Sequence, residues 1–415
     1  MLCTLFLLQL GALSPAPQSD DLSAAPAGPL ATAVAEDYVA HAQLRFRDAL
    51  DGAVQMNRAI QAFLRAPSEE LHLAAKEAWL EAHTIYSHCE VFRFGNPNVD
   101  AWEGKVNAWP MDEGLIDYVA EGYVFHEGNP FATWNIVSNG DMPIDDELIA
   151  AFAEGTDPKA AYELRMSDVE SNVTTGYHAL EFLLWGQDLN AESDAGRGGH
   201  RPYTDYVVGD DCTNGRCDRR RQYLSAAAGL LMYDLRFAAN DWAPEGRLYG
   251  KTFRELPLEE RLDRILIGMG SLSYAEVASE RIRVALLTGD QEEEQSCFSD
   301  TTHLATLNNV LGIETLYLGR HVKRDGTTAE CASMSSLIAA LDPELDAEMR
   351  RRFTATREAA RAVADRGEAV EPFDAMIAAE DGDGRALLEA LIARLFEQAE
   401  LLETIRGRVS ELAQL

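Results

Sequence analysis

The most informative short segment of this sequence places a histidine and a glutamate three residues apart, in Gly-Tyr-His-Ala-Leu-Glu at residues 176–181. On a helix, residues three apart share a face, so the His178 imidazole and the Glu181 carboxylate converge on one point. Helical bundles use such pairs to hold metal ions. A solvated or purely structural pair is the alternative, because nine histidines and many acids produce this spacing by chance in a chain of this length.

A second candidate face lies earlier in the chain. Polar and aromatic side chains recur there at steps of three and four beside an apolar stripe: Trp79, His83, Tyr86, Glu90 and Arg93. A plain core helix does not need such a face. We interpret Glu90 as a candidate third ligand of a metal and Arg93 as a group that orients a carboxylate or holds an anion. A surface ion pair between these two residues is the alternative.

A loop or helix start at residues 109–113 offers two more carboxylates. Trp109 and a proline stand next to Asp112 and Glu113 in the string Trp-Pro-Met-Asp-Glu. These residues are candidates for the lining of the same site. Carboxylates are also ordinary partners of a helix N-terminus, which is the simpler interpretation.

The string Cys-Phe-Ser-Asp-Thr-Thr-His at residues 297–303 is the last polar cluster of interest. Ser299 or Asp300 would cap the helix that follows, and both are candidates to shape the cleft or to support the metal ligands. A Ser/Asp/His nucleophile would need a spatial arrangement that closeness in sequence does not provide.

Several strong signatures are absent from the sequence. The His126-Glu127 pair has Pro130 where the second histidine of a His-Glu-x-x-His zinc protease would stand, so a protease of that type is excluded. The chain also contains no phosphate-binding loop, dinucleotide-binding glycine pattern, haem-attachment motif or Cys-x-x-Cys. A metal ion or a small ligand remains as the candidate partner.

The elements that must position these residues are helices, because nearly every long segment has apolar residues at helical spacing. The stripe that begins at Leu71 reaches Cys89 and Phe92 and predicts that Cys89 points into the core. Asp342 and Pro343 predict the start of another helix, which Gly367 would close. Alternating strand patterns are scarce. We therefore predict an all-α fold of two packed helical-bundle domains, in a duplicated four-helix-bundle arrangement.

The clearest break in this pattern lies between residues 186 and 223, where turn-forming residues continue for over thirty positions. We predict a signal peptide and Pro-rich leader (1–30), an N-terminal bundle that carries the histidine–glutamate pair (31–190), a connecting loop (191–222) and a C-terminal bundle (223–415). Residues 180–186 and 313–319 form a weak internal repeat with a Glu five positions before a Gly. Leu311 stands where His178 would fall, so the halves would not offer equivalent sites.

Length and charge exclude several classes of protein. At 415 residues the chain is long enough for two domains with a substantial core. Its 69 acidic and 36 basic residues give a formal net charge of -33. Binding of nucleic acid or of anionic lipid requires clustered Lys and Arg, so we exclude nucleic acid as a partner.

The N-terminus and the cysteines both suggest export. Residues 1–14 form an apolar run followed by a Pro-rich stretch, which is typical of a secretory signal peptide and too short for a transmembrane span. Its start lacks basic residues, and a buried first helix is the alternative. Cys212 and Cys217 bracket a short loop and predict a local disulfide in an oxidising compartment. Pairing of Cys297 with Cys331 also stays open. We expect a periplasmic or secreted protein.

Four strings together resemble the imelysin-like family, which includes bacterial iron-regulated protein A and the imelysin-type metallopeptidases. They are residues 90–95, 109–113, 176–186 and 297–303, and the last is more similar to the iron-regulated protein A branch. The resemblance runs from about Asp37 to the C-terminus. It implies a two-domain helical protein of the periplasm or outer-membrane surface, associated with iron uptake or regulation, with a site between the domains at Gly-x-His-x-x-Glu.

Three functions follow as hypotheses. The first is an exported iron-binding protein with envelope iron-uptake proteins as partners. His178, Glu181 and Glu90 would bind the metal, because oxygen ligands with one imidazole suit iron. The second is a metallopeptidase with zinc on His178 and Glu181 as a ligand or general base, although three protein ligands are not evident. The third is a non-catalytic scaffold with a structural His–Glu pair. We favour binding over catalysis.

Overall fold

A computed structural model describes residues 27–123, 129, 131–140, 144, 171–189, 198–243, 248–290, 293–322 and 327–412. The predicted signal segment lies almost wholly outside these residues. Within them all regular secondary structure is helical apart from one antiparallel pair of short strands, β1 (Arg320–Val322) and β2 (Thr328–Glu330). The predicted all-α class is therefore confirmed.

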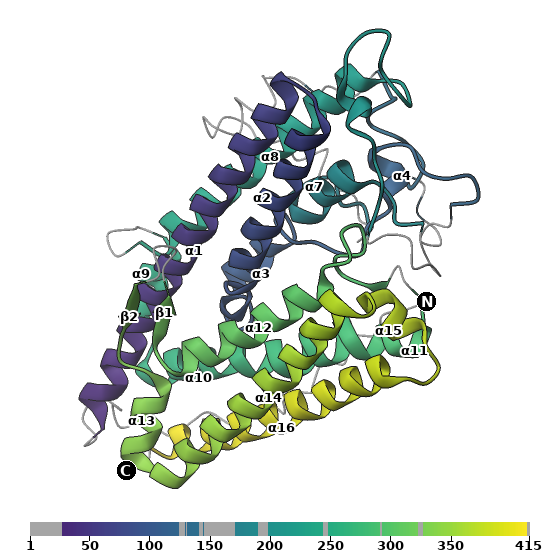
Figure 1. The fold of residues 1–415 in the computed structure, drawn as a ribbon. Helices are drawn as coiled ribbons and strands as arrows, with labels where there is room; N and C mark the ends of the chain where they lie inside the picture. Colours follow the sequence, from purple (N-terminus) through teal and green to yellow (C-terminus); the bar gives the residue numbers. More distant parts are fainter. Residues whose placement is uncertain are drawn as a thin grey trace.

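The first group of helices forms most of the upper part of the molecule in Figure 1, and its helix α1 extends from there to the lower left, past the two strands. The long helices α1 and α2 pack side by side, α8 packs along α1, and the short α7 lies against α2 and α8. The bounds of these elements and of the shorter helices around them are α1 (Gly28–Arg65), α2 (Glu69–Ser87), η2 (Glu90–Phe92), α3 (Pro97–Glu103), α4 (Glu113–Ile116), α7 (Gly176–Trp185), η3 (Tyr203–Tyr206) and α8 (Cys217–Asp241).

The second group forms the lower part of the molecule (Figure 1), where α14 and α16 pack against each other and against α12, α10 and η4. The element η4 is a π-helix that continues α10 without a break and leads into α11. The bounds are α9 (Tyr249–Glu255), α10 (Leu258–Ser271), η4 (Leu272–Arg283), α11 (Val284–Thr288), α12 (Thr302–Tyr317), α13 (Met334–Leu341), α14 (Pro343–Ala369), α15 (Phe373–Ala378) and α16 (Asp383–Leu412).

The two groups share one continuous hydrophobic core. Contacts of α12 with α2 and of α1 with α10 join them. Within this core Cys89 is 1% exposed, which confirms the prediction that its thiol points inward. The His–Glu pair on α7 therefore lies in the first group at a place where the second group is close.

Helix α8 differs from the expected domain division. It begins at Cys217 and runs through residue 223, where the second bundle was expected to start, and it packs on α1 of the first group. Its buried face includes Leu224, Leu231 and Leu235, so it completes the first group of helices. The division of the chain into two domains, with a connecting loop over 191–222, stays a prediction.

Local capping explains where several helices begin and end. Asp342 accepts a hydrogen bond from the Leu345 amide at 3.0 Å, and Pro343 follows it, so α14 begins where the sequence predicts. The helix continues two residues past Gly367, to Ala369. Helix α2 ends earlier than its apolar stripe indicates, at Ser87, and a 3-10 turn then carries Glu90.

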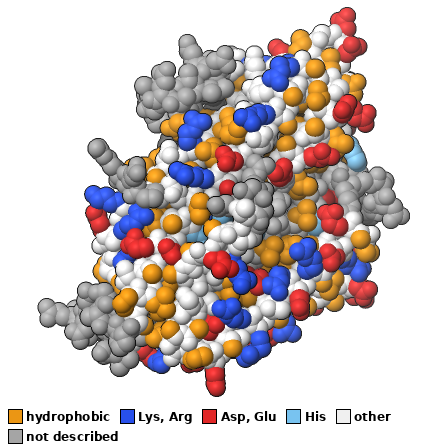
Figure 2. All heavy atoms as spheres, turned by 60° about the vertical axis from the view of Figure 1, so that its left-hand side comes forward, with side chains coloured by type: hydrophobic (Ala, Val, Ile, Leu, Met, Phe, Trp, Pro, Cys, Tyr) orange, Lys and Arg blue, Asp and Glu red, His pale blue; other side chains and the backbone are white. Residues whose placement is uncertain are grey.

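The disulfide between Cys212 and Cys217 forms as predicted, whereas Cys297 and Cys331 are not bonded to each other. Each helix in the described part of the chain is either too short or too polar to traverse a lipid bilayer. On the face shown in Figure 2, acidic and basic side chains are interspersed with apolar ones, with no large area of a single charge.

Candidate functional site

Helix α7 begins at a residue that must be glycine. Gly176 has a φ of +92°, and a Cβ atom on it would lie 2.5 Å from the carbonyl oxygen of Val106. The next residue, Tyr177, donates its amide hydrogen to that same carbonyl at 2.7 Å. The close approach of the two backbones thus requires both the positive φ and the absence of a side chain. It places His178 in the first turn of a helix whose residues are all buried.

His178 and Glu181 meet one helical turn apart, as their spacing predicts. The Nδ1 atom of His178 lies 2.8 Å from Oε2 of Glu181, and both side chains are fully buried. The other carboxylate oxygen, Oε1, accepts hydrogen bonds from the amide of Ser299 at 3.0 Å and from its hydroxyl at 2.6 Å. The second ring nitrogen of His178, Nε2, is buried without a hydrogen-bond partner. A buried imidazole with one nitrogen held and the other unpaired is the main chemical feature of the site.

Burial favours the uncharged form of both residues. It lowers the pKa of His178 to about 3, and Arg281 contributes to this shift while Glu90 opposes it. Burial also raises the pKa of Glu181 to about 8, although the hydrogen bonds from Ser299 and the nearby His83 act in the opposite direction. The imidazole is therefore neutral at physiological pH, which is the form that binds metals.

A second imidazole lies beside this pair. The ring of His83 is 5.3 Å from the ring of His178, in an edge-on arrangement, and it stacks on Trp79 at 4.8 Å. Its Nε2 atom lies 3.0 Å from Oδ1 of Asn107. Burial, with a contribution from His178, lowers the pKa of His83 to about 4, so this ring is also neutral. The polar face that the sequence indicates on α2 thus reaches the site through His83.

Glu90, the third metal ligand expected from the sequence, is close to the site but is already bonded. Its carboxylate pairs with the two terminal guanidinium nitrogens of Arg281, Nη1 and Nη2, and accepts a hydrogen bond from Asn309 at 2.9 Å. Burial alone would raise the pKa of Glu90, but Arg281 more than offsets that effect and the pKa lies below its ordinary value. Glu90 is therefore a buried anion compensated by an arginine from the π-helix η4.

Tyr86, Arg93 and Trp109 are three other residues that the sequence predicts near the site. The ring of Tyr86 packs on Tyr177 at 5.1 Å. Arg93 forms ion pairs with acids at 3.0–3.4 Å, namely Asp100, Glu103 and Glu276, rather than with Glu90. Trp109 is half-buried and precedes a cis proline.

Asp112 and Glu113 belong to a separate polar cluster. Asp112 accepts a hydrogen bond from the Ser171 hydroxyl at 2.7 Å and another from Asn129. The amide of Glu113 donates to the hydroxyl of Tyr123 at 3.0 Å. None of these bonds involves His178 or Glu181, although α4, which begins at Glu113, packs against α7.

Ser299 and Asp300 do reach the site, from the turn before α12. Ser299 holds Glu181, while Oδ2 of Asp300 accepts a hydrogen bond from the amide of Gly198 at 2.7 Å. Asp300 has a φ of +54°, a conformation that residues other than glycine adopt rarely and often at functional positions. The predicted residues that converge are thus His178, Glu181, Ser299 and, one residue further, Asp300.

Sequence reasoning missed several polar residues near this convergence. Arg281 and Asn309 lie on η4 and α12, and Asp188, Glu294 and Asp374 belong to loops or helix starts with no motif of their own. Only the fold brings these positions together. His83 was visible as part of a polar helix face, but its spacing alone did not distinguish it from its neighbours.

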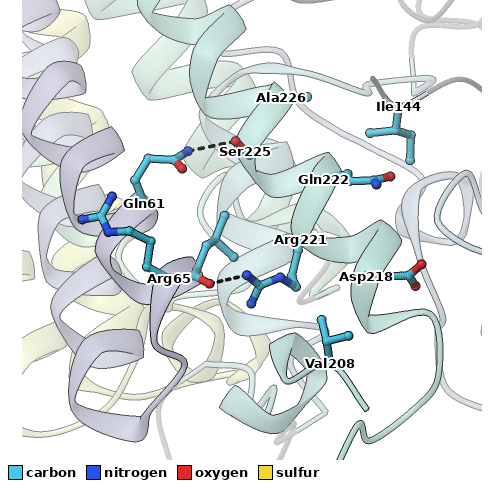
Figure 3. Close-up of a pocket in the computed structure, with 10 residues that line it drawn as sticks. Gln61, Arg65, Ile144, Val208, Asp218, Arg221, Gln222, Ser225 and Ala226 are labelled. Carbon is cyan, nitrogen blue, oxygen red and sulfur yellow. Dashed lines mark hydrogen bonds between the residues drawn. The ribbon is translucent and has the colours of Figure 1, made fainter. Parts of the chain in front are cut away.

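A pocket of about 530 Å³ lies elsewhere, between the end of α1 and the start of α8. Figure 3 shows Gln61 bonded to Ser225, and Arg221 reaching the backbone of α1 next to Arg65. The residues that line this pocket include none of those that contact His178 or Glu181. We therefore treat the buried pair, rather than this pocket, as the candidate site.

The fold and the buried pair define the class: an all-helical protein of packed bundles with a candidate metal centre on one helix. The sequence matches the Imelysin (Peptidase_M75) family over residues 42–402, and the chain belongs to that family.

Individual relatives agree with this assignment. The chain is 32% identical over 71 residues to Iron-regulated protein A of Synechococcus elongatus, a match that covers 17% of this chain and only 20% of that relative's length. Two crystal structures share the fold. One, from Parabacteroides distasonis, is described as a candidate iron-regulated protein A precursor, with a TM-score of 0.66, 17% identity and coverage of 94% of this chain and 97% of that one. The other, an imelysin-like protein from Psychrobacter arcticum, has a TM-score of 0.53, 13% identity and coverage of 90% and 94%.

Proposed function

We propose that this chain is an exported iron-binding protein of iron uptake or homeostasis, and that His178 and Glu181 bind its iron cargo. The observation that carries the proposal is the buried His178 ring, held at Nδ1 by Glu181 and unpaired at Nε2. Once Glu181 is ionised, its carboxylate accepts the Nδ1 proton and leaves a lone pair on Nε2, which is how metal-binding histidines are oriented. The names of the relatives support iron as the cargo.

The residues around the pair fit such a cargo. His83 provides a second neutral imidazole next to His178, and Glu181 would complete a set of two histidines and one carboxylate by turning from Nδ1 of His178 to the ion. That combination is the ligand set of many ferrous sites. Binding through Glu90 would require its ion pair with Arg281 to open, so we assign Glu90 and Arg281 a positioning role. Ser299 would hold Glu181 in place.

The proposal extends to location and partners. The description of one structural relative as a precursor and the disulfide between Cys212 and Cys217 support an oxidising compartment such as the periplasm or the extracellular space. Proteins of envelope iron uptake are the partners we expect.

Anaerobic calorimetry with ferrous iron, combined with elemental analysis, tests the proposal. We expect one iron per wild-type chain, and affinity lowered at least about tenfold in His178→Ala and in Glu181→Gln. His41→Ala is the matched control, because His41 is also a buried histidine, with 3% exposure, but lies on α1 among other partners. Equal iron binding by wild type and His178→Ala would end the proposal.

Metallopeptidase activity is the second candidate, because the family carries that name. The same variants separate the two functions. Cleavage of an unfolded substrate that a chelator stops and that Glu181→Gln abolishes would favour a zinc peptidase. A protein that neither binds iron nor cleaves would instead be a scaffold with a structural His–Glu pair.

A further inference from the structure

Three aspartates from distant parts of the chain meet beside the candidate site. Asp188 follows α7, Asp300 precedes α12, and Asp374 lies in the first turn of α15. One carboxylate oxygen from each residue lies within 4.8 Å of the others. Asp300 and Asp374 are buried, and Asp188 is half-buried. The fold thus brings three acids into a space in which their charges repel one another.

A fourth acid next to this group has no hydrogen-bond partner. The Glu294 side chain is fully buried, and neither of its carboxylate oxygens forms a hydrogen bond. Burial first, and then the neighbouring acids Asp300 and Asp374, raise the pKa of Glu294 well above its ordinary value, while the nearby Thr302 hydroxyl acts in the opposite direction. The Oδ1 atom of Asp300 is also buried and unpartnered. Three buried carboxylate oxygens without a hydrogen-bond partner thus belong to Glu294 and Asp300, six residues apart in the segment before α12.

Other buried acids in the described part of the chain show how this protein usually compensates such charges. Glu90 pairs with Arg281, and Asp117 pairs with Arg201 at 2.7 Å and with Arg220 at 2.5 Å. A buried carboxylate without a basic partner is unfavourable, because it must take up either a proton or a cation. No arginine is among the strongest electrostatic neighbours of Asp300 or of Glu294.

We propose that Asp188, Asp300 and Asp374 form a binding site for a hard cation, with Glu294 as a further oxygen donor. Hard cations such as Ca²⁺ prefer carboxylate oxygens at 2.3–2.6 Å, so donors on opposite sides of the ion lie about 5 Å apart. The 4.8 Å limit on the three oxygens agrees with that size. The site contains no imidazole or thiolate, which distinguishes it chemically from the histidine site.

The proposed cation site uses ligands other than those of the iron site. It uses none of the nitrogen donors at His178 and His83, and its aspartates are held by other elements, with Asp300 bonded to the Gly198 amide. The two sites are nevertheless neighbours, because Ser299 bonds to Glu181 and the next residue is Asp300. Each proposal can therefore fail without the other.

Calorimetric titration of the chelator-treated full chain with CaCl₂ tests the cation site. We expect one Ca²⁺ per wild-type chain and affinity lowered at least about tenfold in Asp374→Asn. Asp346→Asn is the matched control, since Asp346 and Asp374 are both 5% exposed and both lie in the first turn of a helix. Asp346 lies outside the acidic group and is held instead by Tyr317 at 3.1 Å and by Arg350 at 2.8 Å. His178→Ala should bind Ca²⁺ as wild type does.

Thermal unfolding provides a second readout. Ca²⁺ should raise the Tm of the wild type but not that of Asp374→Asn, because a ligand stabilises only the state that binds it. If Asp374→Asn does not fold, Asp188→Asn replaces it, since Asp188 is only half-buried. The proposal is overturned if millimolar CaCl₂ gives neither heat of binding nor a change in Tm, or if the aspartate variants bind Ca²⁺ as tightly as the wild type.

Discussion

At the scale of single residues, the protein buries histidines in their neutral form. His72, His83 and His178 are each at most 5% exposed, and burial holds the pKa of each well below its ordinary value. For His178 this neutrality prepares Nε2 for a metal. The Nε2 atom of His72 lies 2.8 Å from the Leu184 carbonyl, and its ring stacks on Phe63. For this residue the neutral form is structural, and protonation in acid lowers the free energy of unfolding.

We predict that His72 makes the fold sensitive to acid. Its folded-state pKa of about 4 lies below the ordinary value of 6.5, so the unfolded chain takes up the proton first as the pH falls. Stability that is present above pH 6.5 is therefore lost between pH 6.5 and pH 4. The loss attributable to His72 approaches about 3 kcal/mol, because each pKa unit corresponds to about 1.4 kcal/mol.

Urea unfolding of the wild type and of His72→Gln at a series of pH values measures this effect. Glutamine can still donate to the Leu184 carbonyl but does not titrate. The wild type should lose more free energy of unfolding than His72→Gln across this interval. Parallel curves for the two proteins would contradict the prediction.

The residues of the candidate site were predictable only in part. The convergence of His178 and Glu181 follows from helix geometry, and Ser299 reaches Glu181 as a candidate from a separate string. The pairing of Glu90 with Arg281 was not predictable, because 191 positions separate them and no local pattern relates η2 to η4. Long sequence separation likewise hides Asp374, which meets Asp188 and Asp300 only because of the fold.

At the scale of elements, the start of α7 determines where His178 stands. The positive φ of Gly176 and the contact with the Val106 carbonyl are two separate constraints on that start. A comparison with Gly122 separates them, because Gly122 has a φ of +86° but no atom within 4 Å of the position of a Cβ.

We predict that Gly176→Ala destabilises the protein more than Gly122→Ala does. Both variants incur the cost of a left-handed alanine, about 1–2 kcal/mol. Only Gly176→Ala must also move the backbone at Val106, which should add at least about 1 kcal/mol. Chemical denaturation of both variants measures the difference. Equal losses would show that the close contact at Val106 relaxes without cost.

The helices themselves were largely predictable from apolar spacing and caps, as the start of α14 at Pro343 illustrates. The interruptions were less so. The apolar stripe of α2 continues through Cys89 and Phe92, yet the α-helix ends at Ser87. A 3-10 turn buries these residues as well, so burial alone does not show where the α-helix ends. Similarly, the side of the molecule to which α8 belongs depends on long-range packing against α1 that its own sequence does not specify.

At the scale of the whole molecule, the net charge of -33 opposes compaction. Figure 2 shows that the face in view carries both signs of charge, so the excess is distributed rather than gathered there in one patch. Many surface acids pair with arginine, as Glu348 does with Arg351 at 2.6 Å and with Arg352 at 2.8 Å. Such exposed pairs contribute little to stability, because solvent and salt screen them.

We predict that NaCl stabilises the fold. Salt screens the long-range repulsion of the excess acids and weakens the surface ion pairs, and the first effect should dominate because the pairs contribute little. The Tm should rise by a few degrees between about 10 mM and 500 mM NaCl, measured by calorimetry in a buffer without divalent ions. A steady fall of the Tm over this range would show that the ion pairs matter more than the excess charge.

The turn before α12 has a consequence for the molecule as a whole. The hydroxyl of Ser299 and the carboxylate of Asp300 belong to consecutive residues, yet one holds Glu181 and the other joins Asp188 and Asp374. If an ion bound at one site moves this turn, the movement reaches the other site, because a single peptide unit separates Ser299 from Asp300. If both iron and the hard cation bind, thermodynamic reciprocity requires that each ion change the affinity of the protein for the other ion by the same factor.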